Sequence, residues 1–307
     1  MHTLPIGVFD SGLGGLTVAR EIMRALPEES VVYFGDTARC PYGPRQPHEV
    51  REFVLQIGSW LARQPVKLIV IACNTATAAG LALAQQVFDV PVVGVVEPGA
   101  RAAVKATINR KVGVIGTVGT VDSGVYSAAV RLLDAGATVF SVATPRFVDV
   151  VEQGLRMGPG TLEDWLSESS DVFIRPSFYE MARDYLDPLK RNGIDTLVLG
   201  CTHFPLLSAA IQQVVGANVR LISSAEETAR EVAATLEARD QLASDEGRFE
   251  RYVTTGDVDE FARLGGRVLR RRTTDVAQVS LSELEALLDG RLREALRAFD
   301  AGESACD

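Results

Sequence analysis

Short aliphatic runs, each followed by glycine or polar residues, recur through the first hundred residues of the chain. Such runs lack the polar alternation of a half-exposed strand and are typical of parallel strands covered on both faces. They occupy residues 6–9, 31–34, 68–71 and 90–96. Segments with helical periodicity lie between them, at residues 16–26, 48–63 and 75–87. The alternation predicts an open α/β sheet, whose ligands bind beyond the carboxyl ends of the strands.

The second half of the chain repeats this plan. Aliphatic runs follow in the same order at residues 112–115, 138–142, 195–201 and 219–222. In both halves a glycine-containing loop follows the first run, and the repeated order of strands and loops indicates a diverged duplication. We therefore predict two similar α/β domains with mostly parallel sheets flanked by helices, related by a pseudo-twofold axis, with an active site in the interdomain cleft.

Domain boundaries are expected where the repeat begins and ends. Residues 1–98 plus 224–281 should form the first domain and residues 99–223 the second, with an insertion near 154–170. The remaining residues, 282–307, carry leucines at helical spacing and predict one amphipathic helix at 282–299 followed by a frayed tail. Four arginines within residues 267–272 are expected in a solvated strand or loop.

One cysteine in each half stands at the end of an aliphatic strand. Cys73 follows the third run within Ala-Cys-Asn-Thr, and Cys201 stands at the end of its run before Thr-His. The turn that opens a helix leaves N–H groups unpaired, and a thiolate beside them is stabilised. Each cysteine taken singly could be an inert core residue. Two cysteines in matching positions with polar neighbours favour a chemical role.

Composition narrows the functional classes. The 307 residues are 47% hydrophobic and 23% charged, which is ordinary for a folded protein of about two domains. A net charge of −9 disfavours nucleic acid or an anionic membrane as a partner. The four cysteines are widely spaced and form no C-x-x-C, which predicts neither a disulfide framework nor a zinc site. With no leader and no apolar run long enough to cross a membrane, we expect a cytoplasmic protein.

Two cysteines facing each other across a cleft suit proton transfer at an atom held between them. One would remove a proton from one face while the other returns a proton to the opposite face. The reference pKa of a thiol, ~8.5, is near enough to neutrality for thiol and thiolate to coexist. Asp10 and His203 also stand at strand ends and could exchange a proton with a cysteine, although His203 could equally be a structural histidine. Neutral donors for a substrate are Ser11, Asn74, Thr75, Thr117, Thr120 and Thr202.

Five segments closely resemble motifs of the glutamate racemase family in order and spacing: DSGLGGLTV, GDTARCPYG, ACNTATA, VEPG and GCTHFPLL. The resemblance runs from about residue 6 to residue 281. It implies cofactor-independent, reversible interconversion of L- and D-glutamate, which supplies D-glutamate for peptidoglycan synthesis. It makes Cys73 and Cys201 the two acid/base residues, assisted by Asp10 and His203, with Glu152 as a further acidic residue near the second cysteine. The substrate-contacting positions that it implies are Asp10, Ser11, Pro41, Tyr42, Gly43, Asn74, Thr75, Thr117, Thr120, Thr202 and His203.

The residues themselves leave several alternatives open. A racemase for aspartate or another amino acid of the same superfamily would use the same cysteine pair, and only the resemblance of the 41–43 loop favours glutamate. A decarboxylase needs one proton donor, so two cysteines count against it. A ligand-binding protein would need no matched thiols, and a redox sensor would form a reversible disulfide between Cys73 and Cys201.

No metal, pyridoxal phosphate or nucleotide is expected as a cofactor. No lysine stands at a strand end to form a Schiff base, and the loop at 10–15 lacks the dinucleotide fingerprint. The predicted partner is the small-molecule substrate, and we expect a homodimer. The assignment of Cys73 to D-glutamate and Cys201 to L-glutamate follows the resemblance and not the spacing.

Overall fold

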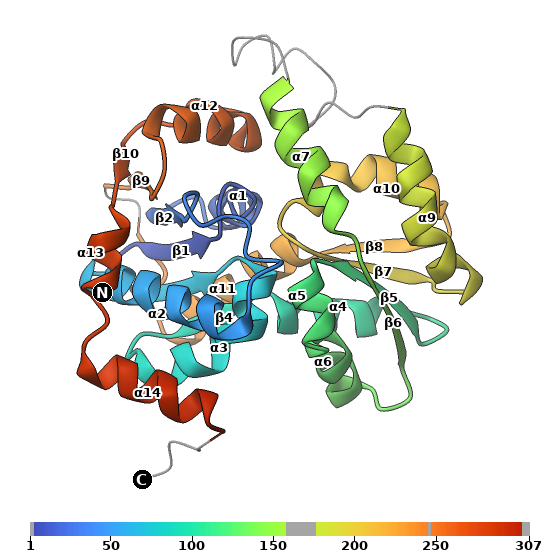
Figure 1. Cartoon of the computed structure of the whole chain (residues 1–307), viewed down its shortest axis with the longest axis horizontal. Coiled ribbons are helices and arrows are strands. Elements are labelled where there is room, and N and C mark those ends of the chain that lie inside the picture. The colour runs from blue at the N-terminus through green and yellow to red at the C-terminus, as the bar shows by residue number, and fades with distance from the viewer. Residues whose placement is uncertain (1–2, 158–175, 245–246, 303–307) are drawn as a thin grey trace.

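Two parallel β-sheets lie side by side in the computed structural model, which describes residues 3–157, 176–244 and 247–302 (Figure 1). The first sheet contains β1 (Ile6–Asp10), β2 (Val31–Gly35), β3 (Leu68–Ile71), β4 (Val92–Gly94), β9 (Glu250–Thr254) and β10 (Val276–Gln278). The second contains β5 (Lys111–Gly116), β6 (Thr138–Ala143), β7 (Thr196–Gly200) and β8 (Arg220–Ser223).

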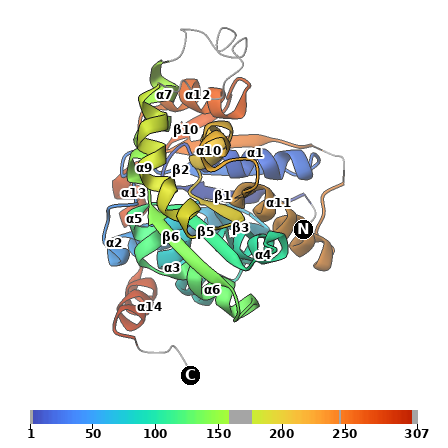
Figure 2. The same cartoon turned by 90° about the vertical axis from the view of Figure 1, so that its right-hand side faces the viewer.

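Helices follow most of the strands and flank both sheets (Figures 1 and 2). Those up to β5 are α1 (Leu16–Ala25), α2 (Pro47–Arg63), α3 (Asn74–Val87) and α4 (Val96–Ala106). Those between β5 and β8 are α5 (Val118–Asp122), α6 (Val125–Leu133), α7 (Pro145–Met157), α9 (Ser177–Arg191), the 3₁₀ helix η1 (Phe204–Leu207) and α10 (Ser208–Val215). The chain then adds α11 (Ser224–Ala238), α12 (Val258–Leu269), α13 (Leu281–Glu285) and α14 (Gly290–Asp300). None of the described helices is long and apolar enough to cross a membrane.

The strand order repeats between the two sheets. It is β10-β9-β2-β1-β3-β4 in the first sheet and β6-β5-β7-β8 in the second, and every neighbouring pair is parallel. The order β2-β1-β3-β4 therefore corresponds to β6-β5-β7-β8, and the third strand of each series is the one that precedes a cysteine. The predicted α/β fold, with mostly parallel sheets flanked by helices, is confirmed.

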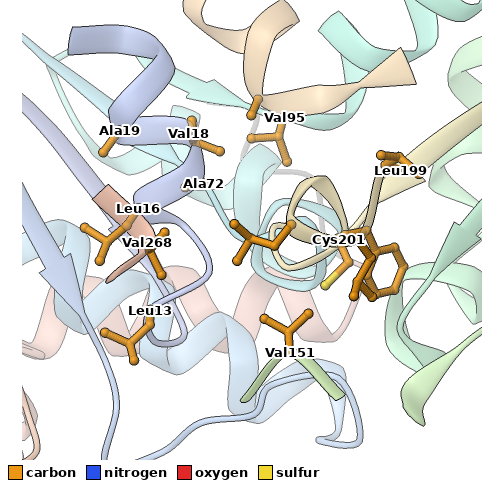
Figure 3. Close-up of a cluster of buried hydrophobic side chains, with 14 of the residues drawn as sticks. Leu13, Leu16, Val18, Ala19, Ala72, Val95, Val151, Leu199, Cys201 and Val268 are labelled. Carbon is orange, nitrogen blue, oxygen red and sulfur yellow. The ribbon is translucent and has the colours of Figure 1, made fainter. Parts of the chain in front are cut away.

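One hydrophobic core joins the two sheets. All residues of β1 and β3 are buried, and the largest cluster of buried side chains includes Val70 of the first sheet and Leu199 of the second. Cys201 belongs to the same cluster, together with Val151 of α7 (Figure 3). Because close-packed side chains deform little, this shared core holds the carboxyl ends of β3 and β7 at defined positions relative to each other.

Helix α7 links the second half of the chain to α12, which packs against α1 of the first half. The Arg156 Nε atom of α7 lies 3.3 Å from Glu260 Oε1 of α12. In the opposite direction, the guanidinium of Arg267 in α12 donates to the Leu155 carbonyl oxygen of α7. Arg267 is buried within α12, which corrects the prediction of a solvated strand or loop for this one residue; Arg270, Arg271 and Arg272 lie past the end of the helix and are exposed, as predicted. Arg267 belongs to the last turn of α12, and its guanidinium satisfies the carbonyl group of buried Leu155 in α7.

The C-terminal leucine stripe forms two helices, α13 and α14, instead of the single helix predicted at 282–299. The Asp289 side chain accepts a hydrogen bond from the Leu292 amide at 2.9 Å and so caps a new helix. Leu292 and Leu288 pack with Leu55 of α2 and Leu83 of α3. The stripe therefore docks on helices of the first half.

Two other element boundaries differ from the prediction. Strand β4 ends at Gly94, and the VEPG motif opens α4 because its Pro98 stands in the first helical turn, where no amide donor is needed. Residues 154–157, predicted as the start of an inserted loop, form the last turn of α7. The rest of the predicted insertion, like Cys306 in the predicted tail, lies outside the described residues.

Candidate active site

Cys73 is held at the N-terminus of α3, two residues beyond the end of β3. Its Sγ atom accepts a hydrogen bond from the Ala76 amide at 3.4 Å and lies 3.9 Å from Ser11 Oγ. Burial raises the pKa of this thiol to about 12, with a further rise from the charge of Asp10 and a partial offset from the Ala76 amide. Cys73 is therefore a protonated thiol at neutral pH until a bound group lowers its pKa.

Cys201 directly follows β7 and begins a chain of three interacting groups. Its Sγ atom lies 3.7 Å from His203 Nδ1, and His203 Nε2 lies 2.9 Å from Glu152 Oε1. Burial alone would lower the pKa of His203, but the hydrogen bonds to Cys201 and Glu152 outweigh burial and raise it well above the ordinary value. Burial would raise the pKa of Glu152, but His203 and Arg156 outweigh it and hold that pKa below its usual range. An ionised carboxylate and a protonated imidazole thus stand behind the Cys201 thiol.

The two thiols line one narrow cavity between the halves of the chain. From the first half come Ser11, Pro41, Tyr42, Gly43, Cys73, Asn74 and Thr75, and from the second Thr117, Val148, Cys201, Thr202 and His203. Its volume is about 20 Å³, close to the space that one water molecule needs. A larger ligand therefore requires the walls to move apart. Of these lining residues only Val148 was not singled out from the sequence, because an apolar residue at helical spacing is typical of a core position.

A second cavity of about 310 Å³ adjoins the first, with Pro41 and Val148 in both walls. It lies between α7 and α12, and its lining includes Cys40, Glu152 and Glu260. The space next to the thiols therefore continues toward the contact between these two helices. Movement of α7 away from α12 would widen both cavities, because Val148 of α7 lines both.

Three predicted site residues do not line the first cavity: Asp10 and Thr120 are buried, and Glu152 lines the second cavity. The Asp10 carboxylate accepts hydrogen bonds from the Gly12 amide at 3.0 Å and from Thr202 Oγ1 at 3.4 Å. Burial raises its pKa, opposed by the charge of His203 and by amides of the glycine loop. Asp10 thus connects β1, in the first half of the chain, to Thr202, the residue after Cys201 in the second half.

A cluster of threonine hydroxyls joins the two halves beside the cavity. Thr75 Oγ1 of α3 lies 2.8 Å from Thr117 Oγ1, which in turn lies 3.0 Å from Thr120 Oγ1. The Gly119 amide donates to the Gly43 carbonyl oxygen at 3.0 Å. Hydroxyl groups both donate and accept, so this cluster can exchange its internal hydrogen bonds for bonds to a ligand.

The loop at residues 41–43 is tied down by one buried carboxylate. Asp36 accepts hydrogen bonds from Arg39 Nε at 2.7 Å and from Thr255 Oγ1 at 2.8 Å, and it also accepts one from the Tyr42 hydroxyl. Asp36 is completely buried. Because the Tyr42 hydroxyl is engaged by Asp36, the backbone of this loop is the part left to contact a ligand.

Asn74 presents a hydrogen-bond donor without a partner among the described residues. Its Oδ1 atom accepts from the Tyr126 hydroxyl at 2.7 Å, whereas Nδ2 is buried with no partner. A buried unsatisfied donor is costly, and one that lines a cavity is suited to an oxygen atom of a ligand. Tyr126 was not singled out from the sequence, because an aromatic residue at helical spacing is more often part of a core.

The chemistry that this site offers is proton transfer. Across residues 3–157, 176–244 and 247–302, no three His, Cys, Asp or Glu side chains are grouped so that they could hold a metal ion. The titratable groups that line the cavity are the two thiols at equivalent strand ends, His203, which is paired with Glu152, and Tyr42, whose hydroxyl is held by Asp36. An atom held between the thiols would have one possible proton acceptor and one possible proton donor on opposite sides.

Residues 6–232 match the model of the family described as Asp/Glu/Hydantoin racemase. The match covers well over half of the chain, and the chain therefore belongs to the Asp/Glu/Hydantoin racemase family. A glutamate racemase from Corynebacterium diphtheriae is 48% identical over 277 residues, which are 90% of this chain and 98% of that relative. Within the family, the chain belongs to the glutamate racemases, which are isomerases.

Solved structures agree with this placement. The structure of a glutamate racemase isoform from Bacillus anthracis superimposes with a TM-score of 0.82 and 44% identity, covering 92% of this chain and 99% of that one. A glutamate racemase from Francisella tularensis in complex with D-glutamate gives a TM-score of 0.81 at 29% identity, covering 93% and 100% of the two chains. An allantoin racemase from Klebsiella pneumoniae, at 18% identity and a TM-score of 0.54, shares the fold alone.

Proposed function

We propose that this protein interconverts L- and D-glutamate by moving a proton between the two faces of the Cα atom, with Cys73 and Cys201 as the acid/base pair and no cofactor. The observation that carries the proposal is the placement of both thiols on one cavity, each after the third strand of its series. Membership of the glutamate racemases indicates the substrate, and the related Francisella structure contains D-glutamate.

Each turnover uses one thiolate and one thiol. The thiolate removes the Cα proton, and the electron pair left on Cα is delocalised into the adjacent carboxylate. The opposite thiol then donates its proton to the other face of Cα, which inverts the configuration. Proton exchange with solvent restores the starting state, and no oxidation or reduction occurs. Following the resemblance, Cys73 takes the proton from D-glutamate and Cys201 takes it from L-glutamate.

The two thiols are prepared differently. Cys201 has His203 beside it, and the ion pair with Glu152 keeps that imidazole in place as a proton relay. Within the part of the chain that the structure describes, the Cys73 thiol has only the Ser11 hydroxyl and the Ala76 amide in hydrogen-bond contact. An amino-acid ammonium group beside this buried thiol would lower its pKa, because an opposite charge favours the thiolate. Substrate binding thus supplies part of the activation on the Cys73 side.

The substrate carboxylates are held by neutral donors. Asn74 Nδ2 is a buried donor without a partner among the described residues, and the serine and threonine hydroxyls that line the cavity belong to Ser11, Thr75, Thr117 and Thr202. The backbone of residues 42–43 adds further polar groups. Asp10 and Thr120 act from behind the wall, where they hold Thr202 and Thr117 in position.

The wider role follows the family resemblance. We propose that the D-glutamate supplies peptidoglycan synthesis in the cytoplasm and that the enzyme acts as a homodimer. We also propose that residues 1–98 with 224–281 form one domain and residues 99–223 the other, and that movement of α7, whose Val148 lines both cavities, admits the substrate to the narrow cavity.

Polarimetry separates the proposal from its nearest alternatives. Purified protein with excess EDTA and no added cofactor should convert either L- or D-glutamate to the racemic mixture and leave L-aspartate unchanged. Racemisation of aspartate with a comparable kcat/KM would show that the enzyme is not specific for glutamate. A constant optical rotation with both amino acids would overturn the proposal and favour a ligand-binding protein.

A further inference from the structure

Tyr126 of α6 reaches across from the second half of the chain to the residue after Cys73. Its side chain is 2% exposed, and its hydroxyl donates to Asn74 Oδ1 at 2.7 Å. The hydroxyl is also close enough to Cys201 for a negative charge on that sulfur to raise the pKa of Tyr126. Tyr126 therefore stands beside both halves of the site, although it does not line the cavity.

The position of the Tyr126 side chain is fixed by its neighbours. A Cβ atom added at Gly200, the residue before Cys201, would lie 3.0 Å from Tyr126 Cε2. One added at Gly99 of the VEPG motif would lie 3.4 Å from the Tyr126 hydroxyl oxygen. The same Cβ atom at Gly99 would lie 3.6 Å from Ser224 Cβ, so Ser224 borders the space around the hydroxyl. The glycines of two motifs thus leave the space that the tyrosine ring and hydroxyl occupy.

The orientation of the Asn74 amide decides what Asn74 offers to a ligand. An asparagine amide has an acceptor on one side and donors on the other, and a half-turn about its terminal bond exchanges them. As the amide stands, Oδ1 is satisfied by Tyr126, and Nδ2 is buried without a partner among the described residues. Reversed, the amide would present a carbonyl oxygen to an anionic substrate and repel it.

Burial raises the pKa of Tyr126, outweighing the opposing effect of the Ser224 side chain. The hydroxyl therefore keeps its proton throughout the neutral range and remains a donor. A tyrosine hydroxyl that donates to Oδ1 cannot be replaced by phenylalanine without loss of this bond, yet the ring volume is retained. The tyrosine-to-phenylalanine change thus isolates the hydroxyl group.

We propose that Tyr126 is a positioning residue: its hydroxyl orients the Asn74 amide so that the NH₂ group faces a carboxylate of the bound amino acid. The role rests on the proposed racemase function and deepens it, since it identifies which groups fix the unpartnered donor of the substrate site. Tyr126 exchanges no proton with the substrate.

A double-mutant cycle tests the role, with racemisation of D-glutamate followed by circular dichroism. Asn74→Ala should lower kcat/KM by about 100-fold, as expected for removal of one oriented donor. Tyr126→Phe should lower it by roughly ten-fold, since the amide is then free to reverse. The double variant should match Asn74→Ala within about two-fold, because Tyr126 acts only through Asn74. Tyr252→Phe is the matched control, since Tyr252 is equally buried and its hydroxyl contacts Glu250 of β9; it should keep the unmodified rate.

Several outcomes would overturn the role. If Tyr126→Phe lowers the rate as much in the Asn74→Ala background as alone, the tyrosine acts independently of Asn74. If Tyr126→Phe racemises glutamate at the unmodified rate, the hydroxyl has no role. A changed pH dependence of kcat/KM in Tyr126→Phe would make the tyrosine a titrating group. Lack of racemisation by the unmodified protein would instead refute the proposed function, so the two failures are distinguishable.

Discussion

Replacement of Glu152 by glutamine should slow the enzyme mainly through His203. The carboxylate lies 2.9 Å from His203 Nε2, and its side chain is 19% exposed, so solvent screens the pair only weakly. Glutamine keeps the size of the side chain and can still accept a hydrogen bond, but it carries no charge. His203 then loses the partner that, with Cys201, holds its pKa above the ordinary value.

The magnitude follows from the hydrogen bond that changes. A hydrogen bond to a charged group contributes roughly 1.5–3 kcal/mol, against roughly 1 kcal/mol for a neutral pair. The difference, about 0.5–2 kcal/mol, corresponds to roughly 2- to 30-fold in rate if the transition state feels all of it. We expect kcat from L-glutamate to fall by about ten-fold in Glu152→Gln, because Cys201 is the proposed base for that enantiomer.

The assay is circular dichroism of initial rates from L-glutamate and from D-glutamate, with Glu260→Gln as the control. Glu260 also contacts Arg156, but its side chain is 47% exposed and makes no contact with His203. Its replacement should leave kcat within about two-fold, as expected for an exposed ion pair. Equal rates in Glu152→Gln and the unmodified enzyme would refute the role of the carboxylate, and so would an equal loss in both variants.

Stability gives a second test of the same pair. His203 has a raised pKa when folded, so its contribution to stability is complete below ~6.5, the reference value, and is lost as pH rises through the folded-state pKa. In Glu152→Gln this contribution is smaller. In a series of thermal melts, the Tm difference between the unmodified protein and Glu152→Gln should therefore narrow as pH rises above 6.5. A difference that widens would contradict a protonated His203 in the folded protein.

Three further perturbations test other parts of the account. Burial raises the pKa of the Cys73 thiol to about 12, so the free energy of unfolding should fall above pH ~8.5. In urea titrations at pH 10, this fall should be about 2 kcal/mol smaller in Cys73→Ser than in the unmodified protein. Gly14→Ala would place a Cβ atom 2.4 Å from Thr202 Oγ1, and the resulting shift should lower kcat/KM by at least about ten-fold; an unchanged value would show that Thr202 need not be held there. Asp36→Asn leaves the buried Arg39 without its charged partner and should cost about 3–5 kcal/mol in urea unfolding, whereas a loss below about 1 kcal/mol would show that the pair is replaceable.

The strands and the two cysteines could be predicted from local sequence. Uninterrupted aliphatic runs mark strands buried on both faces, and the residue after such a run stands at the ligand-binding edge. The correspondence of β3 with β7 could be predicted because the order of strand and loop types repeats. Asn74 and Thr202 directly follow the two cysteines, so the same reasoning places them on the cavity as well.

Contacts that depend on helix packing could not be predicted from local pattern. Glu152 reaches His203 only because α7 lies across the site, and the motif resemblance, not the spacing, pointed to it. Tyr126 and Val148 occupy apolar helical positions that do not differ in sequence from ordinary core. The break between α13 and α14 could not be predicted because the leucine stripe continues through it. Only the Asp289 side chain, which caps the start of α14, marks the new helix.

The most direct test of two-thiol racemisation is proton NMR and chiral analysis of a single early time point in deuterated water, with D-glutamate as substrate. Because different thiols remove and return the proton, the L-glutamate formed should carry deuterium at Cα while the remaining D-glutamate keeps protium. Cys73→Ser and Cys201→Ser should each abolish or severely slow product formation. L-Glutamate that retains the substrate's own proton, or a serine variant with the unmodified rate, would contradict the central claim.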